Sequence, residues 1–422
     1  MSELKPGAVV HLTNGQTATV EKELGRGGQG IVYTVDLNGK KMALKWYLTK
    51  PNENFYKNLK VNIENGAPSS VFIWPEYLTK VENDSFGYIM RLRPRDYYEF
   101  GTFLLAKHSF DSFYAITVAA MDICEGFREL HAQGLSYQDL NDGNFFINPH
   151  TGHVLICDND NVFPHKHKSG IRGKARYMAP EVVNGHDPDA HSDKFSLSVI
   201  LFLLFYGNHP FEGKRVAACP CMTENDEKKF YGTEMNFIYN PVDKSNIPVR
   251  GIHNNVIRLW PIFPELLRKT FISEFSADKL ANPTKRLTEL QWLSVITSIR
   301  DSLIICPHCM GETFVSTDTA ENKCMQCHRA INISNSLVIE DRQLALTADS
   351  KYYIDRNDVA DILVHKSQTN PGLLLMKNLT TKQWLVETPS GKSKVLNPQE
   401  SMPVKTGMKI SFVAFNKKGE II

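Results

Sequence analysis

The sequence has 422 residues, of which 42% are hydrophobic and 22% charged, and its 48 basic and 46 acidic residues leave a formal net charge of +2. This length exceeds one compact core, so two or three domains are expected. The balanced charge gives no reason to expect nucleic acid or an anionic membrane as the main partner. Because the apolar runs are far shorter than the roughly 20 residues of a membrane span, and no secretory pattern is present, a cytoplasmic protein is expected.

The order of strand-like and helix-like patterns predicts two lobes. Alternating β-branched residues predict strands over residues 8–48 and again over 72–93, on either side of one helical stretch at 53–65. Helical periods dominate from about residue 110 onwards. The first 300 residues are therefore expected to form a β-rich lobe, about 1–93, followed by an α-rich lobe, about 94–300.

A glycine-rich turn lies between two of the predicted strands and contains Gly25, Gly27, Gly28 and Gly30. Glycines allow backbone N–H groups to approach phosphate oxygens, although such a turn is more often only a turn. A strand follows it rather than a helix, and no Gly-Lys-Ser/Thr ends it, which argues against a dinucleotide-binding turn and a Walker loop. The next strand ends in Lys45, where a lysine normally extends towards solvent.

Two loops rich in Asp and Asn follow in the second lobe. The first runs from Asp139 to Asn144, and the second begins at Asp158 after an apolar strand at 154–157. In isolation, each loop is typical of ordinary turns. Further along, the segment Ala179-Pro180-Glu181 closes a basic stretch that includes Lys174.

In this order and spacing, the motifs resemble those of the eukaryotic-like (Hanks-type) Ser/Thr protein kinases, bacterial in style, over about residues 15–300. The resemblance implies an α+β bilobal protein-kinase fold that transfers the γ-phosphate of MgATP to a Ser/Thr hydroxyl of a protein, autophosphorylation included. The segment Ala179-Pro180-Glu181 argues against a small-molecule kinase. A nucleotide-binding pseudokinase scaffold remains the alternative function.

The resemblance also implies roles for the catalytic residues. Asp139 takes the place of the base that accepts the proton of the substrate hydroxyl, and Asn144 and Asp158 take the places of the Mg²⁺ ligands. Lys45 takes the place of the lysine that holds the α- and β-phosphates. Glu64 is expected to pair with Lys45, with Glu53 as its rival.

An adenine site follows from the same resemblance. Val32, Ala43 and Phe146 are expected around the adenine, with Met90 as the gatekeeper residue and the four glycines over the phosphates. Each of the apolar residues fits an ordinary core position equally well.

The sequence departs from the family pattern in the catalytic loop and the activation segment. Gln138 replaces the arginine that receives an activation-loop phosphate, so regulation by such a phosphate is not expected. Asn141 replaces the lysine that contacts the γ-phosphate, and Lys174 replaces a threonine. We hypothesise that Lys174 supplies the missing charge, the alternative being a solvated loop lysine.

Two further features concern the segments around the site. Asp158-Asn159-Asp160 replaces Asp-Phe-Gly, so a flip of this segment is not expected. Arg286 is expected to pair with Glu181, as the corresponding residues do in the family.

Two Cys-x-x-Cys pairs, Cys306/Cys309 and Cys324/Cys327, lie behind the kinase-like region. Two such pairs predict a tetrahedral four-thiolate zinc site, although two separate redox or buried pairs are the alternative. Because four thiolates leave no open position, a structural zinc ribbon over residues 301–335 is expected.

The remaining residues, 336–422, alternate between short strand patterns and turns, which predicts a small all-β sandwich. They resemble a forkhead-associated domain, although the phosphopeptide-binding arginine and serine of that family have no identified counterparts. An interaction domain for a docking partner is therefore expected.

Overall fold

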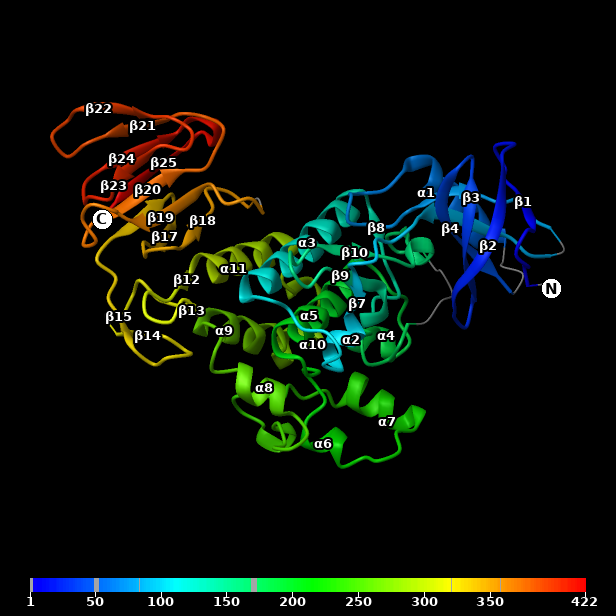
Figure 1. Ribbon diagram of the computed structural model, residues 1–422. Helices are drawn as coiled ribbons and strands as arrows, with labels where there is room; N and C mark the ends of the chain where they lie inside the picture. Colours follow the sequence, from blue (N-terminus) through cyan, green and yellow to red (C-terminus); the bar gives the residue numbers. More distant parts are fainter. Residues whose placement is uncertain (1–2, 49–52, 83, 168–172, 320, 357) are drawn as a thin grey trace. The chain divides into compact units, whose positions relative to one another are not determined.

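The computed structural model describes residues 3–48, 53–82, 84–167, 173–319, 321–356 and 358–422 (Figure 1). The chain divides into two compact units. The first contains residues 1–111, 122–256 and 271–292, and the second contains 112–121, 257–270 and 293–422. Within the part of the chain that the structure describes, none of the helices combines the length and apolar character that a membrane span requires.

The β-rich lobe is a six-stranded sheet in the order β1-β2-β3-β4-β6-β5. Its strands are β1 (Val9–His11), β2 (Thr17–Arg26), β3 (Gly30–Leu37), β4 (Lys40–Tyr47), β5 (Pro75–Leu78) and β6 (Gly87–Arg91). Alternate residues of β3 enter different cores: Ile31 packs in one apolar cluster, whereas Val32 packs against the other. Helix α1 (Glu53–Asn65) joins the second cluster through Leu59. The predicted strand-rich lobe is confirmed.

The following residues are mainly helical. The helices are α2 (Phe100–Leu104), α3 (Phe113–Ala132), α4 (Pro180–Val183), α5 (Ala190–Tyr206), α6 (Lys214–Ala217), α7 (Glu224–Lys228), α8 (Asn254–Leu259), α9 (Glu265–Glu274), α10 (Ala277–Ala281) and α11 (Glu289–Asp301). Helix α5 is buried along most of its length. The Asp189 carboxylate caps its start by accepting from two backbone N–H groups, and Gly207 ends it with φ 66°.

Short strands between the helices hold the two loops rich in Asp and Asn. They are β7 (Tyr98–Glu99), β8 (Leu135–Ser136), β9 (Phe145–Ile147), β10 (Val154–Ile156) and β11 (Phe163–Pro164). Strand β9 pairs with both β7 and β10, and β8 pairs with β11. The loop from β8 to β9 and the loop from β10 to β11 therefore both begin and end on paired strands.

The second unit contains two short hairpins and a β-sandwich. The hairpins pair β12 (Leu303–Ile305) with β13 (Glu312–Phe314) and β14 (Asn322–Lys323) with β15 (Ala330–Ile331). The sandwich has a six-stranded sheet, β17-β16-β25-β24-β21-β22, and a four-stranded sheet, β18-β19-β20-β23. Both sheets contribute to one buried core that includes Leu337, Val364, Trp384 and Phe412. The predicted all-β region is confirmed.

The sandwich strands are β16 (Ser336–Ile339), β17 (Arg342–Ala345), β18 (Lys351–Tyr352), β19 (Ile362–Lys366), β20 (Leu374–Asn378), β21 (Trp384–Glu387), β22 (Ser393–Leu396), β23 (Ser401–Pro403), β24 (Lys409–Phe412) and β25 (Lys417–Ile421). They appear in orange and red in Figure 1.

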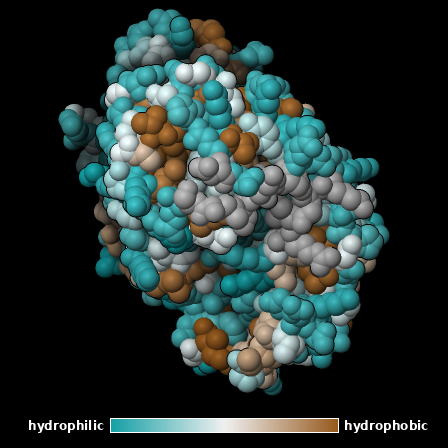
Figure 2. Space-filling model, turned by 90° about the vertical axis from the view of Figure 1, so that its right-hand side faces the viewer, coloured by the Kyte–Doolittle hydropathy of each residue, from teal (hydrophilic) through white to brown (hydrophobic). Residues whose placement is uncertain are grey.

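Most side chains on the face shown in Figure 2 are hydrophilic, and the apolar ones form small separate groups. Scattered exposed apolar residues of this kind are normal on folded proteins. Val9 and Leu24 are examples in the β-rich lobe.

The predicted pair between Arg286 and Glu181 is confirmed. Two guanidinium nitrogens of Arg286 each donate to a different carboxylate oxygen of Glu181 at 2.7 Å, and one also donates to the carbonyl of His191 at 2.9 Å. The Arg286 side chain is only 1% exposed. This bidentate pair ties the Ala-Pro-Glu segment to the residues that precede α11.

Replacing Glu181 by Ala is expected to destabilise the first unit by about 3–5 kcal/mol, because it leaves the Arg286 charge buried without its partner. Urea unfolding followed by circular dichroism measures this loss. The matched control is Asp278→Ala, whose carboxylate pairs with Lys285 in solvent and whose removal should change the unfolding midpoint little. Equal midpoints for both variants would contradict the expectation.

Candidate active site

The loop between β8 and β9 is shaped by its asparagines. The Asn141 side chain accepts from the Gly143 N–H at 3.1 Å, and the Asn144 side-chain oxygen accepts from the Asn141 N–H at 2.7 Å. These bonds cap a 3-10 turn, η1 (Asp142–Asn144), in which Asn144 is buried. The Cys157 N–H donates to the Asn144 carbonyl at 2.8 Å. The structure therefore brings Asn144 next to the segment that carries Asp158.

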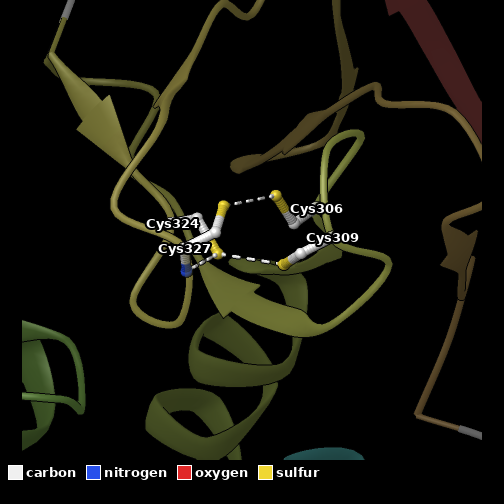
Figure 3. A group of neighbouring side chains, drawn as sticks. All are labelled: Cys306, Cys309, Cys324 and Cys327. Atoms are coloured by element: carbon white, nitrogen blue, oxygen red, sulfur yellow. Dashed lines mark hydrogen bonds between the residues drawn. The ribbon is translucent and has the colours of Figure 1, made fainter.

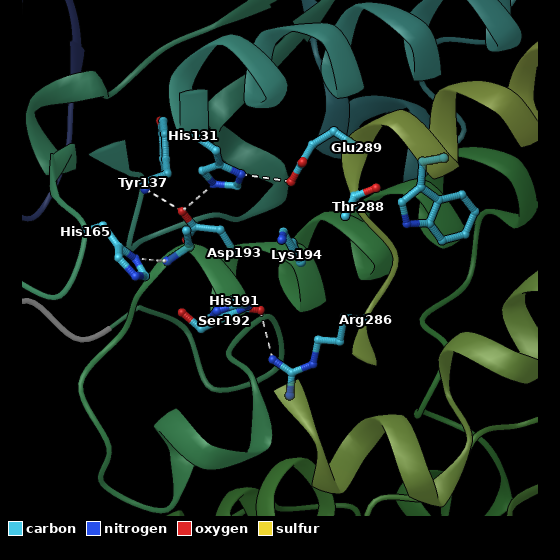
Figure 4. A network of polar contacts seen from close by, with 12 residues as sticks. His131, Tyr137, His165, His191, Ser192, Asp193, Lys194, Arg286, Thr288 and Glu289 are labelled. Atoms are coloured by element: carbon cyan, nitrogen blue, oxygen red, sulfur yellow. Dashed lines mark hydrogen bonds and ion pairs between the residues drawn. The ribbon is translucent and has the colours of Figure 1, made fainter. Parts of the chain in front are cut away.

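The start of this loop is anchored on α5 (Figure 4). The Asp193 carboxylate accepts from the backbone N–H of Tyr137 at 2.6 Å and of Gln138 at 3.2 Å. His131 lies between two carboxylates, with Nε2 3.1 Å from Asp193 and Nδ1 2.8 Å from Glu289. Burial opposes the charged imidazolium, but these two carboxylates outweigh it and raise the pKa of His131 to about 9. A charged network thus holds the start of the loop between β8 and β9.

The sequence marks Asp193 through the segment Ser192-Asp193-Lys194-Phe195-Ser196-Leu197, which resembles the family motif at the start of this strongly apolar helix. His131 was not singled out from the sequence. No local pattern connects His131 with Asp193, because the two residues meet only in the folded protein.

The Asp139 carboxyl lies half-buried beside the second loop. The Asn161 side-chain N–H donates to its Oδ2 at 3.4 Å. Burial raises the pKa of Asp139, and the nearby Asp158 charge raises it further, so that it reaches about 6 even though Lys174 acts in the opposite direction. A carboxyl with this pKa is a competent proton acceptor near neutral pH.

Asp158 precedes a second 3-10 turn, η2 (Asn159–Asn161), and has the left-handed backbone value φ 58°. Half of its side chain is exposed, so its carboxylate is open to a metal ion. Asn159 is fully buried, and its side-chain N–H groups donate to the carbonyls of Ile73 at 2.8 Å and Ile156 at 3.0 Å. These bonds attach the segment to the backbone at Ile73 and Ile156.

Lys45 does not pair with either glutamate proposed for it. Its Nζ lies 2.8 Å from Asp160 Oδ2 and 3.3 Å from Asp158 Oδ1. Glu64 instead is 62% exposed and lies beside Lys60, at 3.9 Å. The predicted Lys45–Glu64 pair is therefore wrong.

The rival Glu53 is also directed into solvent, where it pairs with Lys57 at 2.8 Å.

The helical period of α1 explains why Glu64 does not reach Lys45. Helix α1 buries Leu59 and Asn62, and a residue two positions after Asn62 is rotated by about 200°. Glu64 therefore points away from the sheet.

The four residues proposed around the adenine meet in one apolar cluster, together with Leu155 of β10. They are Val32, Ala43, Met90 and Phe146, and Ala43 lies opposite Met90 across β4 and β6. The Arg93 guanidinium stacks on the Phe146 ring at 4.3 Å. The sequence analysis did not place Leu155 near the adenine site, because a leucine in a β-strand looks the same in the sequence whether it contacts a ligand or only packs in the core.

The glycines of the turn between β2 and β3 differ in their surroundings. At Gly30 an added Cβ would lie 2.2 Å from the Trp46 carbonyl oxygen, so close strand packing requires a glycine there. At Gly25, Gly27 and Gly28 an added Cβ would meet nothing within 4 Å. These three leave open space along the turn, as a phosphate-binding loop needs.

The residues that replace family positions have definite partners. Gln138 is buried, and its Nε2 donates to Ser136 Oγ and the His167 carbonyl, both at 3.1 Å. It therefore faces the protein interior. Lys174 Nζ donates to Asn141 Oδ1 at 3.0 Å, so the lysine contacts one of the residues that replace family positions.

The four cysteines predicted to bind zinc meet in the second unit (Figure 3). Their four Sγ atoms all lie within 4.8 Å of one another. The backbone N–H of His308 points at Cys306 Sγ at 3.5 Å, and that of Gln326 points at Cys324 Sγ at 3.3 Å. N–H groups directed at sulfur suit thiolates rather than neutral thiols.

The two Cys-x-x-Cys pairs form matching turns. Met310 and His328, each directly after the second cysteine of a pair, have φ values of 61° and 58°. Their N–H groups donate to the carbonyls of Cys306 and Cys324 at 3.0 and 2.9 Å. Two such knuckles can present four sulfurs to one tetrahedral ion.

Parts of the chain are similar to known protein kinases. Residues 18–245 match the family model of the protein kinase domain. Rat protein kinase C delta type is 32% identical over 111 residues, which are 25% of this chain and 16% of that protein. Serine/threonine-protein kinase PknA of Mycobacterium tuberculosis is 38% identical over 88 residues, 20% of each chain.

A probable serine/threonine-protein kinase, PknB of Corynebacterium glutamicum, is 30% identical over 99 residues, which are 22% of this chain and 15% of that protein. The chain thus covers a fifth or less of the length of each of these relatives.

Proposed function

The chain belongs to the protein kinase domain family, and on this premise we propose that it transfers the γ-phosphate of MgATP to Ser or Thr hydroxyls of protein, including its own. The observation that carries this proposal is the assembly of Asp139, Asn144, Asp158 and Lys45 around one site. These four groups argue against the pseudokinase alternative, whereas the replacements at Gln138, Asn141 and Asn159 keep it open. All four are present, and the loop that carries Asp139 is anchored by Asp193.

The side chains divide the work of phosphoryl transfer. Bound MgATP supplies the transferred group and the cation that neutralises its charge. Asp158 and Asn144 offer oxygen ligands, the former through an exposed carboxylate. Asp139 orients the substrate hydroxyl and accepts its proton, and the cluster of Val32, Ala43 and Met90 offers an apolar surface for adenine.

The raised pKa of Asp139 leads to a pH-dependent rate. Asp139 accepts a proton only in its ionised form, so kcat/KM is expected to fall about tenfold per pH unit below about pH 6 and to level off above it. Steady-state transfer to a generic acceptor protein between pH 5 and 8 measures the profile. A flat profile across pH 6 would contradict the assignment of Asp139 as the base.

We further propose that Lys174 supplies the positive charge that Asn141 lacks. Its contact with Asn141 Oδ1 supports this role. Replacing Lys174 by Ala is expected to lower kcat about tenfold or more and to move the midpoint of the pH profile upwards, because Lys174 opposes the rise in the pKa of Asp139. Lys166→Ala, an exposed lysine of the same region, is the control. Unchanged turnover in Lys174→Ala would sink the proposal.

The four-cysteine cluster is proposed as a structural zinc site. The distances between its sulfurs and the N–H groups aimed at them support this assignment. Thiolate ligands and MgATP both suit a reducing, nucleotide-rich compartment, so we propose a cytoplasmic location.

We propose that the chain has three domains, at residues 1–300, 301–335 and 336–422. The sandwich is proposed as a forkhead-associated-like docking module for a protein partner, and its own apolar core supports independent folding.

A further inference from the structure

In the kinase family, a glutamate of the helix after the lysine strand orients the lysine. Among the residues that the structure describes, the corresponding helix of this protein, α1, directs no carboxylate at Lys45. The side of α1 that faces the loop after Asp158 carries Asn58 and Asn62. Both side-chain amides donate to the Val162 carbonyl, at 2.7 and 2.9 Å. Helix α1 is therefore attached to the loop by neutral hydrogen bonds and contributes no charge to Lys45.

The charge opposite Lys45 comes from Asp160. Its side chain is fully buried, and Oδ2 accepts both from Lys45 Nζ at 2.8 Å and from the Tyr47 hydroxyl. Lys45 is itself only 9% exposed. Its Nζ lies within 3.3 Å of carboxylate oxygens of both Asp160 and Asp158. The lysine is thus held as a cation in a fixed position.

Asp160 is also held from the backbone side. It lies in η2, whose first residue, Asn159, is bonded to the carbonyls of Ile73 and Ile156. The same turn follows directly on Asp158. The turn and the residue before it therefore provide the buried carboxylate next to Lys45 and the exposed carboxylate open to a metal ion.

We infer that Asp160 is the positioning residue for Lys45 and replaces the helix glutamate of the family. This inference rests on the proposed function, because the phosphates of the nucleotide are what Lys45 is positioned to hold. Since the pair lies within the metal loop and β4, no movement of α1 is needed to form it. In the part of the chain that the structure describes, α1 offers no carboxylate through which a movement of this helix would make or break an ion pair with Lys45.

Asp160→Asn and Glu64→Gln each change a carboxylate to an amide. The first changes the observed partner of Lys45, and the second changes the partner expected from the family. Asp160→Asn is expected to weaken MgATP binding roughly 10- to 100-fold and to raise KM for MgATP accordingly. Its affinity for adenosine, which has no phosphates, should stay within about twofold, whereas a merely structural role would weaken both ligands. Glu64→Gln should bind MgATP and adenosine as the wild type does. Isothermal titration calorimetry of the full-length protein measures each affinity.

Tyr47→Phe covers the case in which Asp160→Asn fails to fold. It keeps the carboxylate but removes its second donor, and a few-fold loss of MgATP affinity is expected, with adenosine again unaffected. Wild-type MgATP affinity in Asp160→Asn, or a loss in Glu64→Gln as large as in the Asp160 or Tyr47 variant, would overturn the inference. If the wild-type protein binds MgATP but transfers no phosphate, the proposed function alone is contradicted. If it binds no MgATP, both the proposed function and the inference about Asp160 are contradicted.

Discussion

Asp139→Asn is expected to lower phosphate transfer by roughly 10²- to 10⁴-fold, the usual contribution of a positioned general base. The amide keeps the size of the side chain but cannot accept the hydroxyl proton. MgATP affinity should change little, because the proposed nucleotide contacts come from Lys45, Asp158 and the apolar cluster. Transfer of labelled γ-phosphate to the protein itself and to a generic acceptor protein measures the effect.

The control for this experiment is Asp278→Asn, the same chemical change at an exposed carboxylate that pairs with Lys285. It should transfer phosphate at the wild-type rate. Undiminished transfer by Asp139→Asn would exclude Asp139 as the base. If the wild type binds MgATP but transfers nothing, the pseudokinase scaffold becomes the better hypothesis.

Loss of the proposed zinc ion is expected to unfold the region around the four cysteines. Structural zinc sites of this kind contribute about 10–16 kcal/mol of apparent binding energy, most of which is folding energy. Replacing the buried Cys324 by Ser is therefore expected to abolish stoichiometric zinc binding and to unfold the two hairpins β12–β13 and β14–β15. Zinc content by atomic absorption and hydrogen exchange of the Gln326 and His308 amides measure both consequences.

Cys221→Ser is the matched control, because Cys221 is an exposed cysteine outside the cluster. It should retain one zinc per chain and the same protection of both amides. Full zinc content and unchanged amide protection in Cys324→Ser would contradict a four-thiolate structural site. A chelator should reproduce the effect of Cys324→Ser in the wild-type protein.

The features that the sequence predicted well are those written in local patterns. Alternation along residues 31–35 and 41–46 decided which side chains of β3 and β4 face each core. The two Cys-x-x-Cys spacings predicted a four-sulfur cluster, since each pair closes its own short turn. The bidentate pair of Arg286 and Glu181 followed from family motifs that each occupy a few consecutive residues.

Strand detection in the sandwich was less complete. The strand patterns read from the sequence correspond to β18, β19, β20, β21 and β24, and they missed β16, β17, β22, β23 and β25. For β22 the exposed pattern shows why: only Leu396 is buried in it, so apolar alternation is nearly absent. Its place at the sheet edge comes from pairing with β21, which is a tertiary contact.

The partner of Lys45 shows what the sequence left open. A glutamate at a plausible distance along α1 was available, but the rotation of the helix about its axis directs Glu64 into solvent and Asn62 inwards. Asp160 reaches the lysine because the fold brings η2 into contact with β4. Local patterns thus determined the residue types, strands and spacings of the site, whereas the identity of the charge opposite Lys45 depended on packing between segments more than 100 residues apart. No local periodicity encodes such a contact.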